Sequence, residues 1–181
     1  MYLYVIRHGQ TDWNLNKKLL SVTDIPLNET GIEQCKEAEK LVKNLNYNLV
    51  FCSPKTRTKE TMEIVNTKSI PVIYDDRLIE RDAKSLEGIN TEDFNYRDFW
   101  TLGKDKIQDC ETIEECKTRV YEFLDEIKEK YKDKNILIVT HNGICRLIHT
   151  YFNGFPKKGD ISQKGHLNAE IKMYEIKNKD A

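Results

Sequence analysis

The chain has 181 residues and a formal net charge of −1, with 33% charged and 39% hydrophobic side chains. This length fits one domain, residues 1–181, with room for a modest insertion. The near-zero charge argues against a nucleic-acid or anionic-membrane binder, because such proteins carry a basic field. No apolar run approaches the roughly 20 residues that span a bilayer, and Arg7 and His8 come too early for a signal peptide. We therefore expect a cytoplasmic protein.

The first part of the chain alternates predicted strands and helices. Residues 2–6 are aromatic and β-branched, which is typical of a strand buried on both faces, and this strand ends at Arg7 and His8. Apolar residues at helical spacing predict a helix over 30–45, with a capping box formed by Thr30 and Glu33.

A second strand, 48–52, runs into Ser53 and Pro54, a predicted N-cap and first helical residue of a helix that continues to about Asn66. A third short strand follows at 71–74. Residues 81–111 are charged and aperiodic, so we expect them to form an insertion or lid.

The last part of the chain returns to the strand and helix pattern. Thr112 and Glu115 form a predicted capping box at the start of a helix that ends near Lys132. Residues 135–140 predict a buried strand and 144–152 a helix, and the alternation over 169–173 indicates an edge or half-exposed strand. The sequence therefore predicts an α/β three-layer sandwich, with helices on both faces of a mostly parallel central sheet and a small lid insertion.

Polar residues gather where the predicted strands end. His8 and His141 each follow a strand, and Arg57 begins the helix after another. The binding crevice of an open α/β sheet lies beyond the carboxyl ends of its strands, so these groups and Arg7 could converge there. Arginine forks and helix N-termini suit a phosphoryl group, and a neutral histidine could attack its phosphorus.

Glu80 is the best-placed carboxylic acid to protonate the leaving oxygen, because it follows an apolar pair just before the insertion. Two other interpretations stay open from spacing alone. The histidines could be structural residues, or they could bind a metal together with Glu80, although no HxH or HxxxH pair supports a metal site. Five scattered cysteines without a CxxC pair indicate neither a disulfide framework nor a zinc knuckle.

Four segments together resemble the signatures of the histidine phosphatase superfamily, the phosphoglycerate mutase-like proteins. Residues 7–14 resemble its RHGxTxxN motif and residues 24–31 its DxPLxxxG segment. Residues 53–61 resemble SPxxRxxxT, and residues 139–143 resemble V(S/T)HGG. The four matches come in the family's order and span nearly the whole chain.

The resemblance implies a role for each matching residue. His8 would be the nucleophile that becomes phosphohistidine through Nε2, and Arg7, Arg57 and His141 would hold the phosphoryl oxygens. Glu80 would be the proton donor, because residues 78–88 resemble the family's LxERDFGxxEG pattern. Further expected substrate contacts are Asn14, Gln10, Thr11, Asn142 and Arg81. The family uses no metal, and we expect no cofactor.

The chain departs from the family pattern in two places. Ala83 and Lys84 stand where an aromatic residue and a glycine are usual, and Asn142 replaces the first glycine after the second histidine. Lys84 could alter the charge or the backbone beside Glu80. Asn142 is a milder change, because asparagine tolerates a left-handed backbone.

We expect a phosphatase acting on a small phosphorylated metabolite. The alternatives are a cofactor-dependent phosphoglycerate mutase and a catalytically silent phosphate-binding module. The mutases have a larger insertion with an adjacent arginine pair, whereas residues 81–111 hold only Arg81 and Arg97. Substrate choice would depend on lid residues, namely Phe94, Tyr96, Arg97, Phe99 and Trp100. The sequence indicates neither the physiological substrate nor an oligomeric state.

Overall fold

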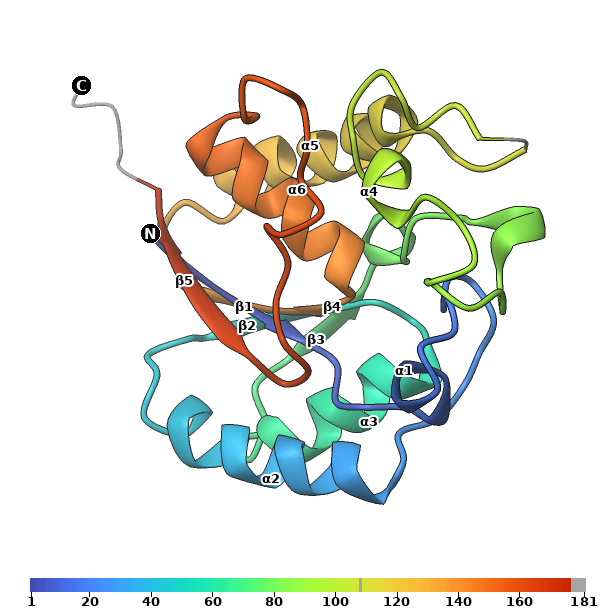
Figure 1. Cartoon of the computed structure of the whole chain (residues 1–181). Coiled ribbons are helices and arrows are strands. Elements are labelled where there is room, and N and C mark those ends of the chain that lie inside the picture. The colour runs from blue at the N-terminus through green and yellow to red at the C-terminus, as the bar shows by residue number, and fades with distance from the viewer. Residues whose placement is uncertain (108, 177–181) are drawn as a thin grey trace.

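The structure is a computed structural model in which residues 1–107 and 109–176 are described. These residues form a five-stranded sheet in the order β3-β2-β4-β1-β5 (Figure 1). Its neighbouring strands are parallel except β5, which lies at the edge and is antiparallel to β1. The strands are β1 (Tyr2–Arg7), β2 (Leu49–Cys52), β3 (Val72–Tyr74), β4 (Ile136–Thr140) and β5 (Ile171–Glu175). The predicted parallel sheet and its C-terminal edge strand are confirmed.

Helices cover both faces of this sheet. Figure 1 shows α2 (Glu29–Val42) and α3 (Thr56–Val65) on one face, and α5 (Ile113–Lys130) and α6 (Asn142–Asn153) on the other. The predicted three-layer α/β sandwich is therefore confirmed. Shorter helices occupy the connections, namely α1 (Asp12–Leu15), α4 (Tyr96–Phe99) and the 3-10 turns η1 (Asp76–Leu78) and η2 (Lys84–Leu86). Among the described residues, no helix is long and apolar enough to cross a bilayer.

The two hydrophobic cores follow from the alternation of side chains along β1. Val5 belongs to the core that contains Phe123 of α5, whereas Ile6 belongs to the core that contains Cys35 of α2. Successive side chains of a strand point to opposite faces, so an uninterrupted apolar strand needs cover on both sides. The fully buried β4 has the same pattern.

Two predicted helix starts are wrong. Helix α2 is capped by Asn28, whose Oδ1 accepts a hydrogen bond from the Gly31 N–H at 2.9 Å, and not by a capping box of Thr30 and Glu33. Helix α3 begins at Thr56, beyond the predicted cap at Ser53. The Ser53 N–H donates to the Val139 carbonyl of β4, so this residue, directly after β2, is still bonded to the neighbouring strand and does not begin the helix.

The remaining long helices begin close to the predicted positions. Thr112 caps α5 by accepting from the Glu115 N–H at 3.2 Å, and the Glu115 carboxylate accepts from the Thr112 N–H at 2.7 Å. This capping box is confirmed. Helix α6 begins at Asn142, two residues before the predicted start, with His141 at its N-cap position.

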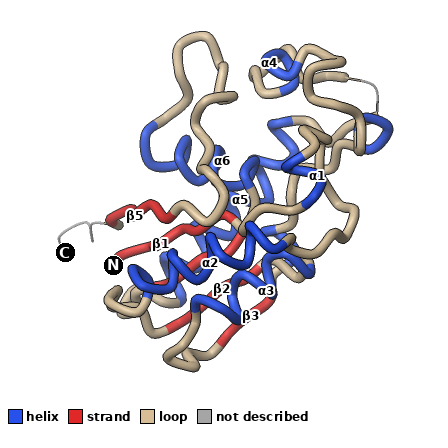
Figure 2. The backbone as a smooth tube through the Cα atoms, turned by 60° about the horizontal axis from the view of Figure 1, so that its bottom comes forward, coloured by secondary structure: helices blue, strands red, loops and turns tan. Residues whose placement is uncertain are grey.

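Residues 81–111 contain η2 and α4 joined by long loops. In the view of Figure 2, α4 and its flanking loops lie at the end of the molecule opposite β2 and β3. The buried Arg81 ties this segment together, because its Nε donates to the Glu111 carbonyl at 2.6 Å and its Nη1 to the Phe99 carbonyl. The guanidinium also stacks on Phe99, 4.1 Å from the ring centroid.

Candidate active site

The two strand-end histidines lie next to each other. β1 and β4 are parallel neighbours in which Arg7 is paired with Thr140, so the next residue of each strand, His8 and His141, reaches the same edge of the sheet. Their rings meet edge to face with centroids 5.3 Å apart. Both side chains are buried, with exposed fractions of 3% and 0%. The sheet topology therefore brings together the two histidines that the sequence separates.

The hydrogen bond of His8 fixes which ring nitrogen is free. His8 Nδ1 lies 2.7 Å from the Gly9 carbonyl oxygen, which can only accept, so Nδ1 carries the proton. Nε2 is then the unprotonated nitrogen. Burial, and next the positive charges of Arg57 and Arg7, hold the pKa of His8 well below its usual value of 6.5. A neutral imidazole with a free Nε2 is the nucleophilic form of histidine.

His141 is held in a different way, by hydrogen bonds to Arg57 and Ser53. Arg57 Nε donates to His141 Nδ1 at 3.2 Å, so the proton of this ring is on Nε2, which lies 2.8 Å from Ser53 Oγ. Burial and the Arg57 charge keep the pKa of His141 well below 6.5. The guanidinium of Arg57 also donates to the carbonyls of Thr23 and Ser21, at 2.8 and 2.6 Å.

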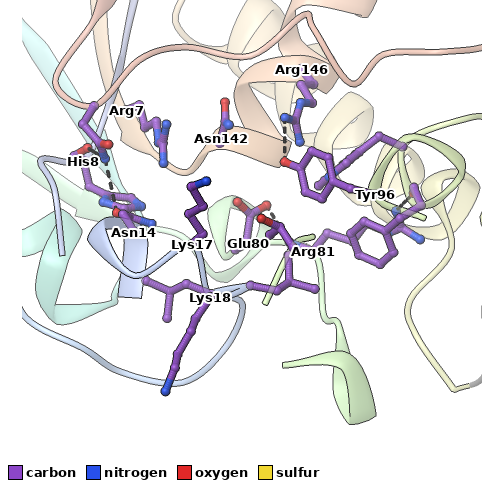
Figure 3. Close-up of a pocket in the computed structure, with 16 residues that line it drawn as sticks. Arg7, His8, Asn14, Lys17, Lys18, Glu80, Arg81, Tyr96, Asn142 and Arg146 are labelled. Carbon is purple, nitrogen blue, oxygen red and sulfur yellow. Dashed lines mark hydrogen bonds between the residues drawn. The ribbon is translucent and has the colours of Figure 1, made fainter. Parts of the chain in front are cut away.

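A cavity of about 380 Å³ opens in front of His8 (Figure 3). This volume is at the small end of the roughly 300–1,000 Å³ of typical ligand sites. Its walls come from the end of β1, the loop around α1, the 80–100 region, α6 and the loop before β5. The lining residues are Arg7, His8, Asn14, Lys17, Lys18, Leu19, Leu20, Glu80, Arg81, Thr91, Tyr96, Phe99, Trp100, Asn142, Arg146 and Asn168.

Two backbone N–H groups hold the carboxylate of Glu80 in this cavity. Oε1 accepts from the Arg81 N–H at 2.9 Å, and Oε2 accepts from the Gly143 N–H at 3.0 Å. The second contact needs a glycine, because a Cβ at position 143 would lie 2.2 Å from Oε1 and 2.4 Å from Trp100 Cη2. Close approach of the first turn of α6 therefore fixes the orientation of the only carboxylate among the lining residues.

The predicted site residues divide into those that line the cavity and those that lie outside its lining. Arg7, His8, Asn14, Glu80, Arg81 and Asn142 line it. Arg57 and His141 are fully buried and are not among the lining residues. Thr11 caps α1 by accepting from the Asn14 N–H at 3.2 Å, and the Gln10 side chain accepts from Asn28 Nδ2 at 3.1 Å. Both therefore support the loop that carries Asn14.

Several lining residues were missed by the sequence prediction. Asn168, just before β5, donates to the His8 carbonyl at 3.1 Å and to Asn14 Oδ1 at 3.3 Å. Arg146 follows Asn142 by four residues on α6, a spacing that places both on one helix face and could have indicated it. Lys17 and Lys18 follow α1 in a loop whose path no local pattern predicts. Of the proposed lid residues, Tyr96, Phe99 and Trp100 line the cavity, and Phe94 and Arg97 do not.

Ala83 and Lys84, which depart from the family pattern near Glu80, lie outside the cavity lining. Lys84 has a φ of +44°, in the left-handed region that glycine adopts without strain. Its exposed ammonium lies 2.8 Å from Asp82, and it is not part of the cavity lining. Ala83 is fully buried. Lys84 thus keeps the backbone shape expected of glycine and carries its charge away from the cavity.

The described residues hold no group of three or more histidine, cysteine, aspartate or glutamate side chains arranged to bind a metal ion. The five cysteines are buried and free. Burial raises the pKa of the Cys145 thiol on α6, so that its neutral form is favoured. The ionisable groups that line the cavity are a histidine, a carboxylate, a tyrosine and several cations.

An α/β sandwich with paired histidines and arginines at the ends of parallel strands is the arrangement found in histidine phosphatases. The sequence model of the histidine phosphatase superfamily (branch 1) matches residues 3–181. The chain belongs to this superfamily, as its four motifs predict.

Known relatives include phosphatases. The chain is 36% identical over 151 residues to the uncharacterized phosphatase PhoE of Bacillus subtilis, covering 83% of this chain and 76% of PhoE. It is 28% identical to phosphoserine phosphatase 1 of Hydrogenobacter thermophilus, over 96% and 84% of the two chains. The crystal structure of the α-ribazole phosphatase from Shigella flexneri superimposes with a TM-score of 0.85 at 26% identity, covering 99% and 92% of the two chains.

Proposed function

We propose that this chain hydrolyses small phosphomonoesters through a phosphohistidine on His8. The observation that carries the proposal is the free Nε2 of a neutral His8 at the wall of a cavity that also contains the fixed carboxylate of Glu80. The phosphatase relatives support the reaction class.

In the first step, His8 Nε2 attacks phosphorus while the bond from phosphorus to the ester oxygen breaks. Glu80, in its acid form, gives its proton to that oxygen, so the product leaves as an alcohol. In the second step, water attacks the phosphohistidine, Glu80 takes a proton from the water, and inorganic phosphate and neutral His8 are restored. This carboxyl group therefore acts once as acid and once as base.

Positive charge around His8 assists both steps. Arg7 lines the cavity, and its Nη1 is held by the His166 carbonyl at 2.8 Å. Arg57 donates to His141 Nδ1, and its charge adds to burial in holding the pKa of both histidines well below 6.5. Fixed cations stabilise the charge that develops on the transferring phosphoryl group. With this charge supplied by arginines, the proposed mechanism uses no metal.

The test is release of inorganic phosphate from p-nitrophenyl phosphate and 3-phosphoglycerate in EDTA. Wild type should release phosphate from at least one of them, and His8→Ala should release none and form no acid-labile phosphoenzyme. His149→Ala, which removes a half-exposed histidine of α6 outside the cavity, is the matched control and should behave as wild type.

Two other outcomes identify the alternative functions. Conversion of 3-phosphoglycerate to its 2-isomer with a bisphosphoglycerate primer, without stoichiometric phosphate, would establish a mutase. Binding of phosphate without turnover of either compound would establish a silent module. Acid-labile labelling that persists at full level in His8→Ala would remove this histidine from the nucleophile role.

A further inference from the structure

The wall of the cavity opposite His8 carries polar groups that the proposed reaction does not use. Figure 3 shows Arg146 of α6 and Tyr96 of α4 on this side, with Glu80 and Asn142 between them and His8. Arg146 is only 3% exposed. Its Nη2 donates to the Tyr96 hydroxyl and to the Ser162 carbonyl, both at 2.9 Å.

Arg146 is a buried cation that pairs with no carboxylate among the described residues. Its Nε and Nη1 have no hydrogen-bond partner, and it forms no ion pair, among the residues that the structure describes. The guanidinium instead stacks on Trp100, 4.3 Å from the ring centroid. A buried charge is costly unless an opposite charge or hydrogen bonds compensate it. This side chain is therefore suited to a negatively charged ligand.

The hydroxyl group of Tyr96 is a hydrogen-bond donor inside the cavity. Tyr96 lines the cavity and accepts a hydrogen bond from Arg146. Its own proton has no acceptor among the described residues, so it is available to a ligand. The cationic hydrogen bond behind the hydroxyl polarises its O–H bond, which strengthens donation to an anion.

The balance of charge in the cavity indicates a ligand with more than one negative group. Five lining side chains are cationic and one, Glu80, is a carboxylate. Arg81 is balanced by the buried Asp105 and Lys17 by Glu92. The cationic lining residues are Arg7, Lys17, Lys18, Arg81 and Arg146. Arg7 and Arg146 repel each other across this space, so separate anionic groups on one ligand would relieve both.

We propose that Tyr96 and Arg146 form an acid subsite for a carboxylate on the leaving portion of the substrate. Tyr96 donates its O–H to the carboxylate and Arg146 supplies the opposing charge. The substrate class is then the phosphomonoesters of small hydroxy acids. This inference rests on the proposed function, because that function places the phosphoryl end at His8. A single hydroxyl and one cation in a cavity of this size suit a carboxylate better than a second phosphate.

The test compares two ligands that differ only in the acid group, 3-phosphoglycerate and glycerol 1-phosphate. Calorimetric titration uses the His8→Ala background, so that binding is measured without turnover. We expect 3-phosphoglycerate to bind about tenfold to hundredfold more tightly, the range of a hydrogen bond to a charged group. Tyr96→Phe in this background should bring the ratio of the two affinities close to one.

Tyr151→Phe is the matched control, because Tyr151 donates its hydroxyl to Asp125 outside the cavity. It should leave the affinity ratio as in the background. Because both ligands share the phosphoryl end, general damage to the fold would weaken both and leave their ratio unchanged.

Equal affinities for the two ligands, or a ratio that Tyr96→Phe does not change, would overturn the acid subsite. Absence of binding by either ligand would also overturn it. Tighter binding of glycerol 1,3-bisphosphate than of 3-phosphoglycerate, abolished by Tyr96→Phe, would replace the carboxylate by a phosphate. A different result would overturn the proposed function and leave the acid subsite standing. In that case the chain with His8 intact would release no phosphate from any substrate, although 3-phosphoglycerate still bound more tightly than glycerol 1-phosphate.

Discussion

Glu80→Gln is the sharpest perturbation of the proposed chemistry, because it removes the proton and nearly preserves the shape. In the wild-type chain each carboxylate oxygen accepts a backbone N–H bond, from Arg81 at 2.9 Å and from Gly143 at 3.0 Å. A carboxamide has one accepting oxygen, so its NH₂ group would face one of these donors. Leaving a buried donor unpaired costs about 1–3 kcal/mol, and we expect this loss of unfolding free energy in a denaturant titration.

The rate should change in a way that depends on the leaving group. Loss of a general acid slows proton-dependent cleavage about 10²–10⁴-fold, or about 3–5 kcal/mol of activation free energy. Substrates with alkyl leaving groups, such as 3-phosphoglycerate, should show this loss. p-Nitrophenolate leaves without a proton, so its release should slow by less than about tenfold.

Single-turnover kinetics with enzyme in excess isolates this step from hydrolysis of the phosphohistidine. Absorbance measures the release of p-nitrophenolate, and rapid quench measures the release of glycerate. Glu126→Gln, at a surface ion pair of α5 with Arg77, is the control for loss of one carboxylate. Equal slowing of both substrates by Glu80→Gln would refute the role of Glu80 as acid and leave it a structural acceptor.

Two further predictions concern stability. Burial and the neighbouring arginines hold the pKa of His8 well below 6.5. Below pH 6.5 the unfolded chain therefore binds more protons than the folded chain, so the melting temperature should fall as the pH is lowered. The fall should be shallower in His8→Asn; identical slopes would contradict this source of pH dependence. Gly143→Ala would place Cβ 2.2 Å from Glu80 Oε1, so we expect denaturation to show about 1–3 kcal/mol of destabilisation by overpacking. Phosphate release from 3-phosphoglycerate should also be slower. A wild-type stability and rate would show that α6 can move.

The sequence predicts the part of the site that depends on strand ends. His8 and His141 are found together because each follows an apolar strand, and parallel strands end at one edge of a sheet. The structure adds that Arg57 donates to His141 and to the carbonyls of Ser21 and Thr23. That placement depends on the path of an irregular loop, which has no periodicity to predict it.

Long-range packing sets the remaining features. Thr30 and Glu33 have the spacing of a capping box, but Asn28 occupies the N-cap position and accepts the Gly31 N–H. Arg146 and Asn168 enter the cavity only because α6 and the approach to β5 pack against the end of β1. Local patterns identify such residues as helical or loop residues, and the folded chain alone shows which cavity they reach.

The hydrogen bonds of Asn168 make completion of the cavity dependent on the last part of the chain. Its amide joins the His8 carbonyl to Asn14 Oδ1, and the neighbouring Ala169 N–H also donates to the His8 carbonyl, at 3.2 Å. A growing polypeptide therefore contains both histidines before the wall around them can close. Synthesis from the N-terminus delays a working pocket until the residues before β5 have emerged and docked, and a chain cut before Gly165 would keep its nucleophile without the support that positions it.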